Sequence, residues 1–116
     1  MNKAYIYIIS FKDRNDVYIG QTKWDVKERL KGHLQHKSTI TKFIVKEMIS
    51  QNDIYIDIID TMIINYDCFH DRQKLSYCER FHMLNIIKDG KYNLLNKAIP
   101  IHFDFKYYDT HYNPNV

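Results

Sequence analysis

Glycine, proline and cysteine are scarce in this chain of 116 residues, which has three glycines, two prolines and two cysteines. So few glycines and prolines exclude long flexible linkers, and the sequence holds no internal repeat or low-complexity tract. The two cysteines, Cys68 and Cys78, match no zinc-finger spacing and no disulfide framework. We therefore expect reduced thiols in an intracellular protein, cytoplasmic or nuclear and not secreted.

Long apolar runs and a strong charge of one sign are also missing. No run approaches the roughly 18 apolar residues that span a bilayer, and the first four residues do not resemble a signal peptide. The formal net charge of +3 permits a phosphate-rich partner without requiring one. The 45% hydrophobic content is enough for a core, and we predict one domain over residues 1–101 and a tail, 102–116, that forms no separate domain.

β-branched and aromatic residues predict the strands. Tyr5 to Ile9 and Val17 to Ile19 are typical strands, and the polar stretch Lys12 to Asp16 between them predicts a hairpin turn. Ile54 to Ile59 alternates as a third strand, and Tyr92 to Leu95 fits a short strand or an extended segment. The predicted fold class is α+β, with a small, mainly antiparallel three-stranded sheet flanked by helices.

Three helices are predicted from apolar spacing and capping residues. Thr22 is the expected cap of the first, with Asp25 three residues later, and its apolar stripe is Val26, Leu30 and Leu34. Ser38 or Thr39 should cap a second helix, from about Ile40 to Ser50, whose inner face is Ile40, Phe43, Ile44 and Met48. A long third helix should begin at a cap, Asp71, and end at Gly90.

Arg29 and His33 lie four residues apart on the first helix, so they share one face at the margin of its apolar stripe. Side chains at such a boundary often reach solvent and have no further role. The alternative is a guanidinium that grips a phosphate, with a histidine one turn away.

Glu79 projects into the apolar face of the third helix, which is formed by Leu75, Cys78, His82, Met83 and Ile86. A carboxylate in such a place costs several kcal/mol unless it is paired. A buried salt bridge would satisfy it, and so would a hard divalent cation such as Mg²⁺.

Tyr7 and Tyr18 lie on the two strands of the predicted hairpin. Tyrosines in strands usually pack in the core or at an edge, and a chemical role requires both hydroxyls on one face of the sheet. The register that decides this depends on the turn.

The ordered set of these residues resembles the GIY-YIG nuclease superfamily over roughly residues 4 to 97. The run Tyr5-Ile6-Tyr7 is followed by Tyr18-Ile19-Gly20-Gln21-Thr22-Lys23, then by Arg29 and His33, then by Glu79, and finally by Tyr92-Asn93. One departure is that Tyr5 stands where the first motif normally begins with glycine.

The resemblance implies a small antiparallel sheet flanked by helices, one divalent ion (Mg²⁺ or Mn²⁺) and DNA as the substrate. By position in the motifs, the implied catalytic residues are Tyr7, Tyr18, Arg29, His33, Glu79 and Asn93, with Glu79 as the metal ligand. Gly20, Lys23 and Asn96 are the implied substrate-binding residues, and Asn96 competes with Asn93 for the position of the family's asparagine.

The sequence therefore predicts a metal-dependent endonuclease that hydrolyses phosphodiester bonds in DNA, with no membrane partner and no small-molecule cofactor beyond the metal. In this hypothesis Tyr7 takes a proton from water with help from Tyr18, His33 or Lys23. Two other interpretations are a nucleic-acid-binding module of nuclease-like fold that does not cut, and an interaction domain for a protein partner.

Overall fold

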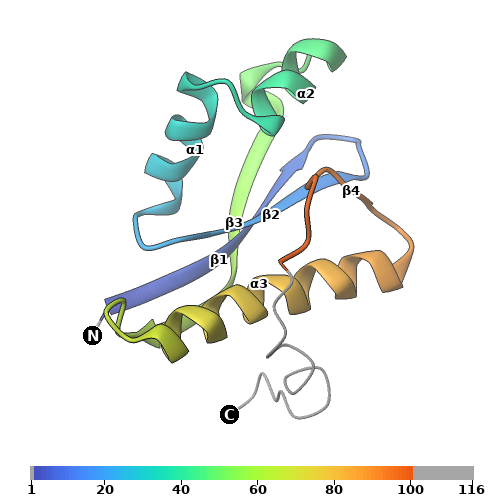
Figure 1. The fold of residues 1–116 in the computed structure, drawn as a ribbon. Coiled ribbons are helices and arrows are strands. Elements are labelled where there is room, and N and C mark those ends of the chain that lie inside the picture. The colour runs from blue at the N-terminus through green and yellow to red at the C-terminus, as the bar shows by residue number, and fades with distance from the viewer. Residues whose placement is uncertain (1, 101–116) are drawn as a thin grey trace.

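The computed structural model describes residues 2–100, and its core is a sheet of four strands with helices on both faces (Figure 1). The predicted tail, 102–116, lies outside the described residues. In chain order the elements are β1 (Asn2–Phe11), β2 (Asp16–Thr22), α1 (Val26–Gln35), α2 (Thr39–Glu47), a 3₁₀ turn η1 (Gln51–Asp53), β3 (Ile54–Ile64), α3 (Phe69–Asp89) and β4 (Asn93–Leu94).

The sheet has the strand order β3-β1-β2-β4. The predicted hairpin is confirmed, because β1 pairs antiparallel with β2 and places Tyr7 opposite Gly20. β3 also pairs antiparallel with β1, whereas β4 pairs parallel with β2 through Asn93 and Leu94 only. The α+β class is correct, but the three-stranded antiparallel sheet is wrong. The sheet is mixed and four-stranded because the segment after α3 returns beside β2.

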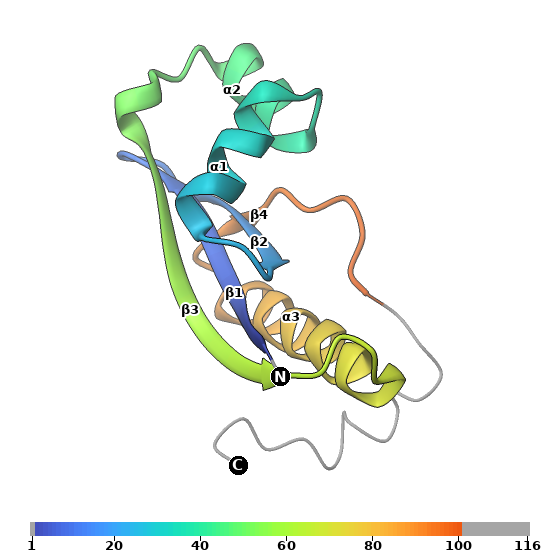
Figure 2. The same cartoon turned by 90° about the vertical axis from the view of Figure 1, so that its left-hand side faces the viewer.

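The two faces of the sheet carry separate hydrophobic cores, with α3 on one face and α1 and α2 on the other (Figures 1 and 2). Alternate residues of β1 serve the two cores, since successive strand residues point to opposite faces. The core under α3 contains Ala4, Ile6, Ile19, Ile64, Leu75, Cys78 and Met83. The core under α1 and α2 contains Tyr7, Ile9, Phe11, Ile40 and Ile54.

The predicted cap of α1 needs correction. Asp25, not Thr22, caps α1, because its carboxylate accepts the backbone N–H groups of Lys27 and Glu28. The Thr22 hydroxyl accepts instead from the backbone N–H of Trp24, at 3.0 Å. Of the two predicted caps of α2, Ser38 or Thr39, the structure has Ser38, and Thr39 is the first residue of the helix.

Met48 is wrong as an inner-face residue, because α2 ends at Glu47. Met48 follows it in the left-handed conformation, with φ of 55°, and is 90% exposed. The inner-face assignment of Ile40, Phe43 and Ile44 is confirmed, since these three pack in one core.

The long helix α3 begins one turn earlier than predicted, at Phe69, so Asp71 lies inside its first turn and is not the cap. The Asp71 carboxylate accepts the backbone N–H of Asn65 and thereby fixes the turn that leads from β3 into the helix. Gly90 ends α3 with a φ of +72°, as predicted for a glycine at this position. No helix within residues 2–100 is both long enough and apolar enough to cross a membrane.

Candidate active site

The hairpin places both motif tyrosines on the face of the sheet that α1 covers. Tyr7 lies opposite Gly20, and two residues further along β1, Ile9 lies opposite Tyr18. Residues paired across a ladder point to the same face, as do residues two apart on one strand. Tyr7 is fully buried and Tyr18 half-buried in the same core. The requirement that both phenols share one face is therefore met.

Gly20 makes room for the Tyr7 ring, because the phenol lies across the strand opposite. A Cβ built on Gly20 would overlap the hydroxyl and Cζ of Tyr7 and would lie 2.9 Å from Cε1. The glycine of the second motif thus has a packing reason, and the neighbouring phenol cannot keep its place without it. Tyr5, which stands where a glycine is usual, continues the regular β1–β2 ladder opposite Thr22.

We expect Gly20→Ala to lower by about 100-fold any catalytic rate that depends on the Tyr7 hydroxyl, because a displacement of about 1 Å in a reacting group has effects of that size. Thermal unfolding should show only the about 1–3 kcal/mol loss that is typical of overpacking. Gly32→Ala on α1 is the matched control, because a Cβ there meets no atom within 4 Å. A wild-type rate in Gly20→Ala would show that the position of Tyr7 does not matter.

His33 joins the tyrosines from α1. Its Nε2 lies 2.7 Å from the Tyr7 hydroxyl, and its ring packs edge-on against Tyr18, with 5.4 Å between centroids. The junction of α1 and α2 holds the histidine from behind, since the hydroxyls of Ser38 and Thr41 both lie within hydrogen-bond distance of its carbonyl oxygen. His33 is therefore a buried, positioned residue, and it does not reach out to solvent.

Burial sets the charge states of this pair. Burial raises the pKa of Tyr7 to about 12, although the nearby Arg29 guanidinium acts in the opposite direction. Burial, reinforced by the positive charge of Arg29, lowers the pKa of His33 to about 4. At neutral pH the phenol is therefore protonated and the imidazole is neutral, so in the tautomer with its N–H on Nδ1 the His33 Nε2 accepts from the Tyr7 hydroxyl.

The depressed pKa of His33 predicts a loss of stability in acid. The unfolded chain binds a proton at His33 below about pH 6.5, whereas the folded chain does so only near pH 4, so stability falls as the pH drops through this window. Between about pH 7 and pH 5 the histidine should contribute a loss of roughly 1–2 kcal/mol. Urea unfolding at both pH values should show a smaller loss for His33→Gln than for the wild type. Equal losses in the two proteins would contradict the assignment.

Arg29 lies one turn before His33, is exposed, and lines a cleft of about 230 Å³ whose lining does not include Tyr7 or Tyr18. The other residues that line the cleft are Gln21, Thr22, Lys23, Trp24 and Tyr66. The ammonium of Lys23 lies over two aromatic rings, 5.2 Å from the centroid of Trp24 and 5.3 Å from that of Tyr66. Lys23 is thus held in the lining of the cleft by aromatic contacts. Burial raises the pKa of the Tyr7 hydroxyl, and Arg29, not Lys23, is the cation that acts to lower it.

Glu79 reaches the same region from α3. Its carboxylate accepts a hydrogen bond from the side-chain amide of Gln21, at 2.8 Å. Burial raises the pKa of Glu79, and its negative charge in turn contributes to the raised pKa values of Tyr7 and Tyr18. Within residues 2–100 no Lys, Arg or His forms an ion pair with this carboxylate. A half-buried carboxylate with one neutral donor suits a divalent cation, which would neutralise it and accept its oxygen as a ligand.

The two competing asparagines have different places. The Asn96 amide spans the backbone of Ile19, accepting from its N–H at 3.0 Å and donating to its carbonyl at 2.7 Å. It therefore fixes the edge of β2 between Tyr18 and Gly20. The Asn93 amide instead donates to the Asp16 carboxylate at the start of β2, away from the phenols.

Two residues of this region were not among the predicted site residues. Gln21 belongs to the second motif, but its partner Glu79 is 58 positions away, so no local pattern shows the contact. Tyr66 lines the cleft with a buried hydroxyl that has no hydrogen-bond partner within the described chain. An exposed run of polar and aromatic residues before α3 is too weak a signal to identify it from the sequence.

A scan against protein-family models matched residues 3–81 to the GIY-YIG catalytic domain. No curated protein and no solved structure matched the chain. The matched range spans β1 to the middle of α3, and so includes Tyr7, Tyr18, Arg29, His33 and Glu79.

Proposed function

Because the chain belongs to the GIY-YIG catalytic domain family, a family of nucleases, we propose that it is a metal-dependent endonuclease that cleaves phosphodiester bonds in DNA. The observation that carries the proposal is the meeting of two phenols, an imidazole, a guanidinium and a carboxylate from β1, β2, α1 and α3. Their mutual influence on pKa and the Tyr7–His33 hydrogen bond support one common site.

Arg29 and Glu79 have the electrostatic roles in the proposed reaction. The exposed guanidinium can bind the scissile phosphate through two parallel hydrogen bonds and stabilise the negative charge added during attack. Glu79 would hold one Mg²⁺ or Mn²⁺, which supplies positive charge beside the phosphate and the leaving oxygen. Gln21 keeps the carboxylate turned toward β2, and Asn96 keeps the edge of β2 in place.

Tyr7 and His33 together are proposed to remove the proton of the attacking water. A phenol with a pKa of about 12 does not ionise at neutral pH, so it cannot act as a preformed base. It can act as a relay, because its proton passes to His33 Nε2, 2.7 Å away, as its oxygen takes the proton of water. This relay requires the neutral tautomer of His33 with its N–H on Nδ1, and the negative charge that develops on the phosphate must offset the low pKa, about 4, of the imidazole.

The residues that line the cleft support a nucleic acid as the substrate. Trp24 is 64% exposed at the end of β2, next to Arg29 in the lining of the cleft. Exposed aromatic rings can stack on bases, and the nearby Lys23 supplies positive charge for the phosphate backbone.

Nicking of supercoiled plasmid by the purified chain, with Mg²⁺ and with EDTA, tests the proposal. We expect nicked and linear products in Mg²⁺ and none in EDTA. A binding module that does not cut would instead retard labelled DNA in a salt-dependent manner without product. A protein-interaction domain would give neither result. Linear, supercoiled, flapped and branched substrates, assayed side by side, then identify the preferred form of DNA.

A further inference from the structure

A β-bulge in β3 turns two successive side chains toward α3. The register with β1 shifts between Ile6 and Tyr7, which pair with Asp60 and Ile58, so that Ile59 is the extra residue. In a regular strand Ile59 and Asp60 would point to opposite faces, whereas a bulge redirects side chains locally. Ile59 lines a groove with Ile8 and α3, and Asp60 contacts α3 directly.

Two side chains of α3 meet Asp60. Cys78 and His82 are four residues apart and therefore lie on the same face of the helix. The His82 Nε2 is 2.9 Å, and the Cys78 Sγ is 3.3 Å, from the same carboxylate oxygen, Oδ2 of Asp60. The three potential ligand atoms all lie within 4.8 Å of one another, and this is the only group of three His, Cys, Asp or Glu ligands so arranged within the described residues.

We propose that Asp60, Cys78 and His82 form a binding site for a zinc ion, distinct from the site at Glu79. One sulfur, one imidazole nitrogen and one carboxylate oxygen are the donor types that tetrahedral Zn²⁺ accepts, at about 2.0–2.3 Å from each donor. The present separations of 2.9 and 3.3 Å between donors need to widen by only a few tenths of an ångström around such an ion. A thiol excludes Mg²⁺ as the preferred occupant, because hard cations select oxygen ligands.

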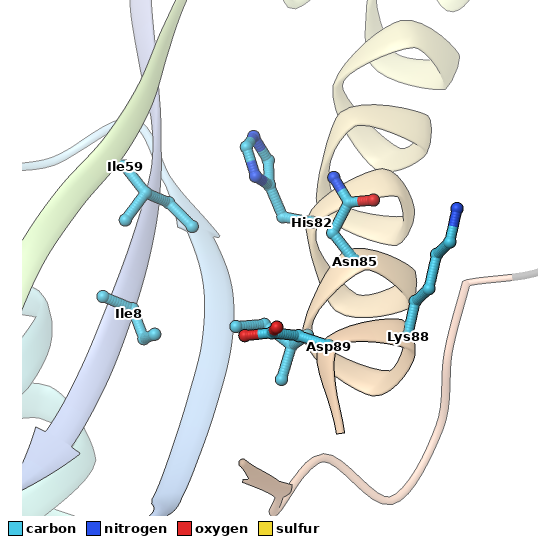
Figure 3. Close-up of a pocket in the computed structure, with 7 residues that line it drawn as sticks. Ile8, Ile59, His82, Asn85, Lys88 and Asp89 are labelled. Atoms are coloured by element: carbon cyan, nitrogen blue, oxygen red, sulfur yellow. The ribbon is translucent and has the colours of Figure 1, made fainter. Parts of the chain in front are cut away.

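Of the three proposed ligands, His82 also lines a groove between the sheet and α3. Figure 3 shows His82 projecting from α3 toward the strands, with Ile8 and Ile59 opposite. The groove has a volume of about 630 Å³ and is lined further along α3 by Asn85, Ile86, Lys88 and Asp89. A site with three protein ligands leaves one position for water or for an incoming donor.

The proposed zinc site and the Gln21–Glu79 pair lie beside different strands. Asp60 belongs to β3, whereas Gln21, which holds Glu79, belongs to β2, and the sheet order places β1 between these strands. Cys78 and Glu79 are neighbours in sequence, but successive side chains of a helix diverge by about 100°. The two proposed sites therefore use different side chains, so variants can test them separately.

Cobalt(II) titration of the full chain tests the proposal, because Co²⁺ substitutes for Zn²⁺ in such sites and reports a thiolate ligand by an intense near-ultraviolet charge-transfer band. We expect one equivalent of Co²⁺ to produce this band, with release of the Cys78 thiol proton to solvent, and one equivalent of Zn²⁺ to abolish it. A large excess of Mg²⁺ should not. Absence of the band would overturn the proposal and leave an ordinary Asp60–His82 ion pair.

Matched variants assign the band to its ligands. Cys78→Ser should abolish it, and Cys68→Ser, at the half-buried cysteine that caps α3, should keep it. Loss of the band in Cys68→Ser with retention in Cys78→Ser would refute the assignment. Asp60→Asn and His82→Gln, both at partly exposed side chains, should weaken Zn²⁺ binding in competition with a chelating dye. Glu79→Ala should retain the band, which separates this proposal from the proposed nuclease function.

Discussion

Glu79→Ala is expected to lower plasmid cleavage in Mg²⁺ by at least about 1,000-fold while the chain still folds. Electrostatic stabilisation by a bound cation contributes several kcal/mol to a transition state, and each about 1.4 kcal/mol is a factor of ten in rate. The fold should survive because burial already raises the pKa of this carboxyl, so its removal relieves a desolvation cost. Rates from single-turnover cleavage and thermal unfolding midpoints measure the two effects.

Glu79→Gln is the more exacting form of the same test. It keeps the size of the side chain and a carbonyl oxygen for the Gln21 amide, but it lacks the charge that a divalent cation needs. Glu28→Gln on the exposed surface of α1 is the matched control and should cleave as the wild type does. Cleavage by Glu79→Gln at the wild-type rate, with unchanged dependence on Mg²⁺, would remove Glu79 as the metal ligand.

The sequence predicted those features of the fold that depend only on a few residues close together in the chain. The hairpin, the Ser38 cap and the Gly90 terminus of α3 are of this kind. Thr22 fits the spacing of a cap equally well, but its hydroxyl bonds to Trp24, and Asp25 takes its place. Thr and Asp are both favoured cap residues, so residue type and spacing alone do not choose between Thr22 and Asp25.

The fourth strand depended on tertiary contacts that no local pattern contains. β4 has two residues and pairs with a strand 77 positions earlier, and Asn96 extends that edge with its side chain in place of backbone. The residues of the candidate site were identified because a family motif fixes their order along the chain. No motif includes the group of Asp60, Cys78 and His82, and the motif that contains Gln21 does not give its partner, since the contacts of Gln21 and Asp60 arise only from the packing of α3 on the sheet.

Tyr7→Phe is expected to lower the cleavage rate by about 100- to 10,000-fold, which is the usual contribution of a positioned acid–base group. The substitution keeps the ring over Gly20 and removes only the hydroxyl that contacts His33. Tyr55→Phe is the control, because Tyr55 is 47% exposed on β3 and belongs to neither core. Single-turnover rates at saturating DNA separate the chemical step from binding.

A double-mutant cycle with His33 distinguishes a proton relay from two independent contributions. His33→Gln keeps an acceptor near the Tyr7 hydroxyl, but an amide does not take up a proton at neutral pH. If the proton of water passes through Tyr7 to His33, either substitution breaks the same path, so Tyr7→Phe with His33→Gln should be no slower than the slower single variant. Groups that act as a unit are non-additive in this way. Multiplied losses in the double variant would contradict the relay and leave His33 as a packing partner of Tyr7 and Tyr18.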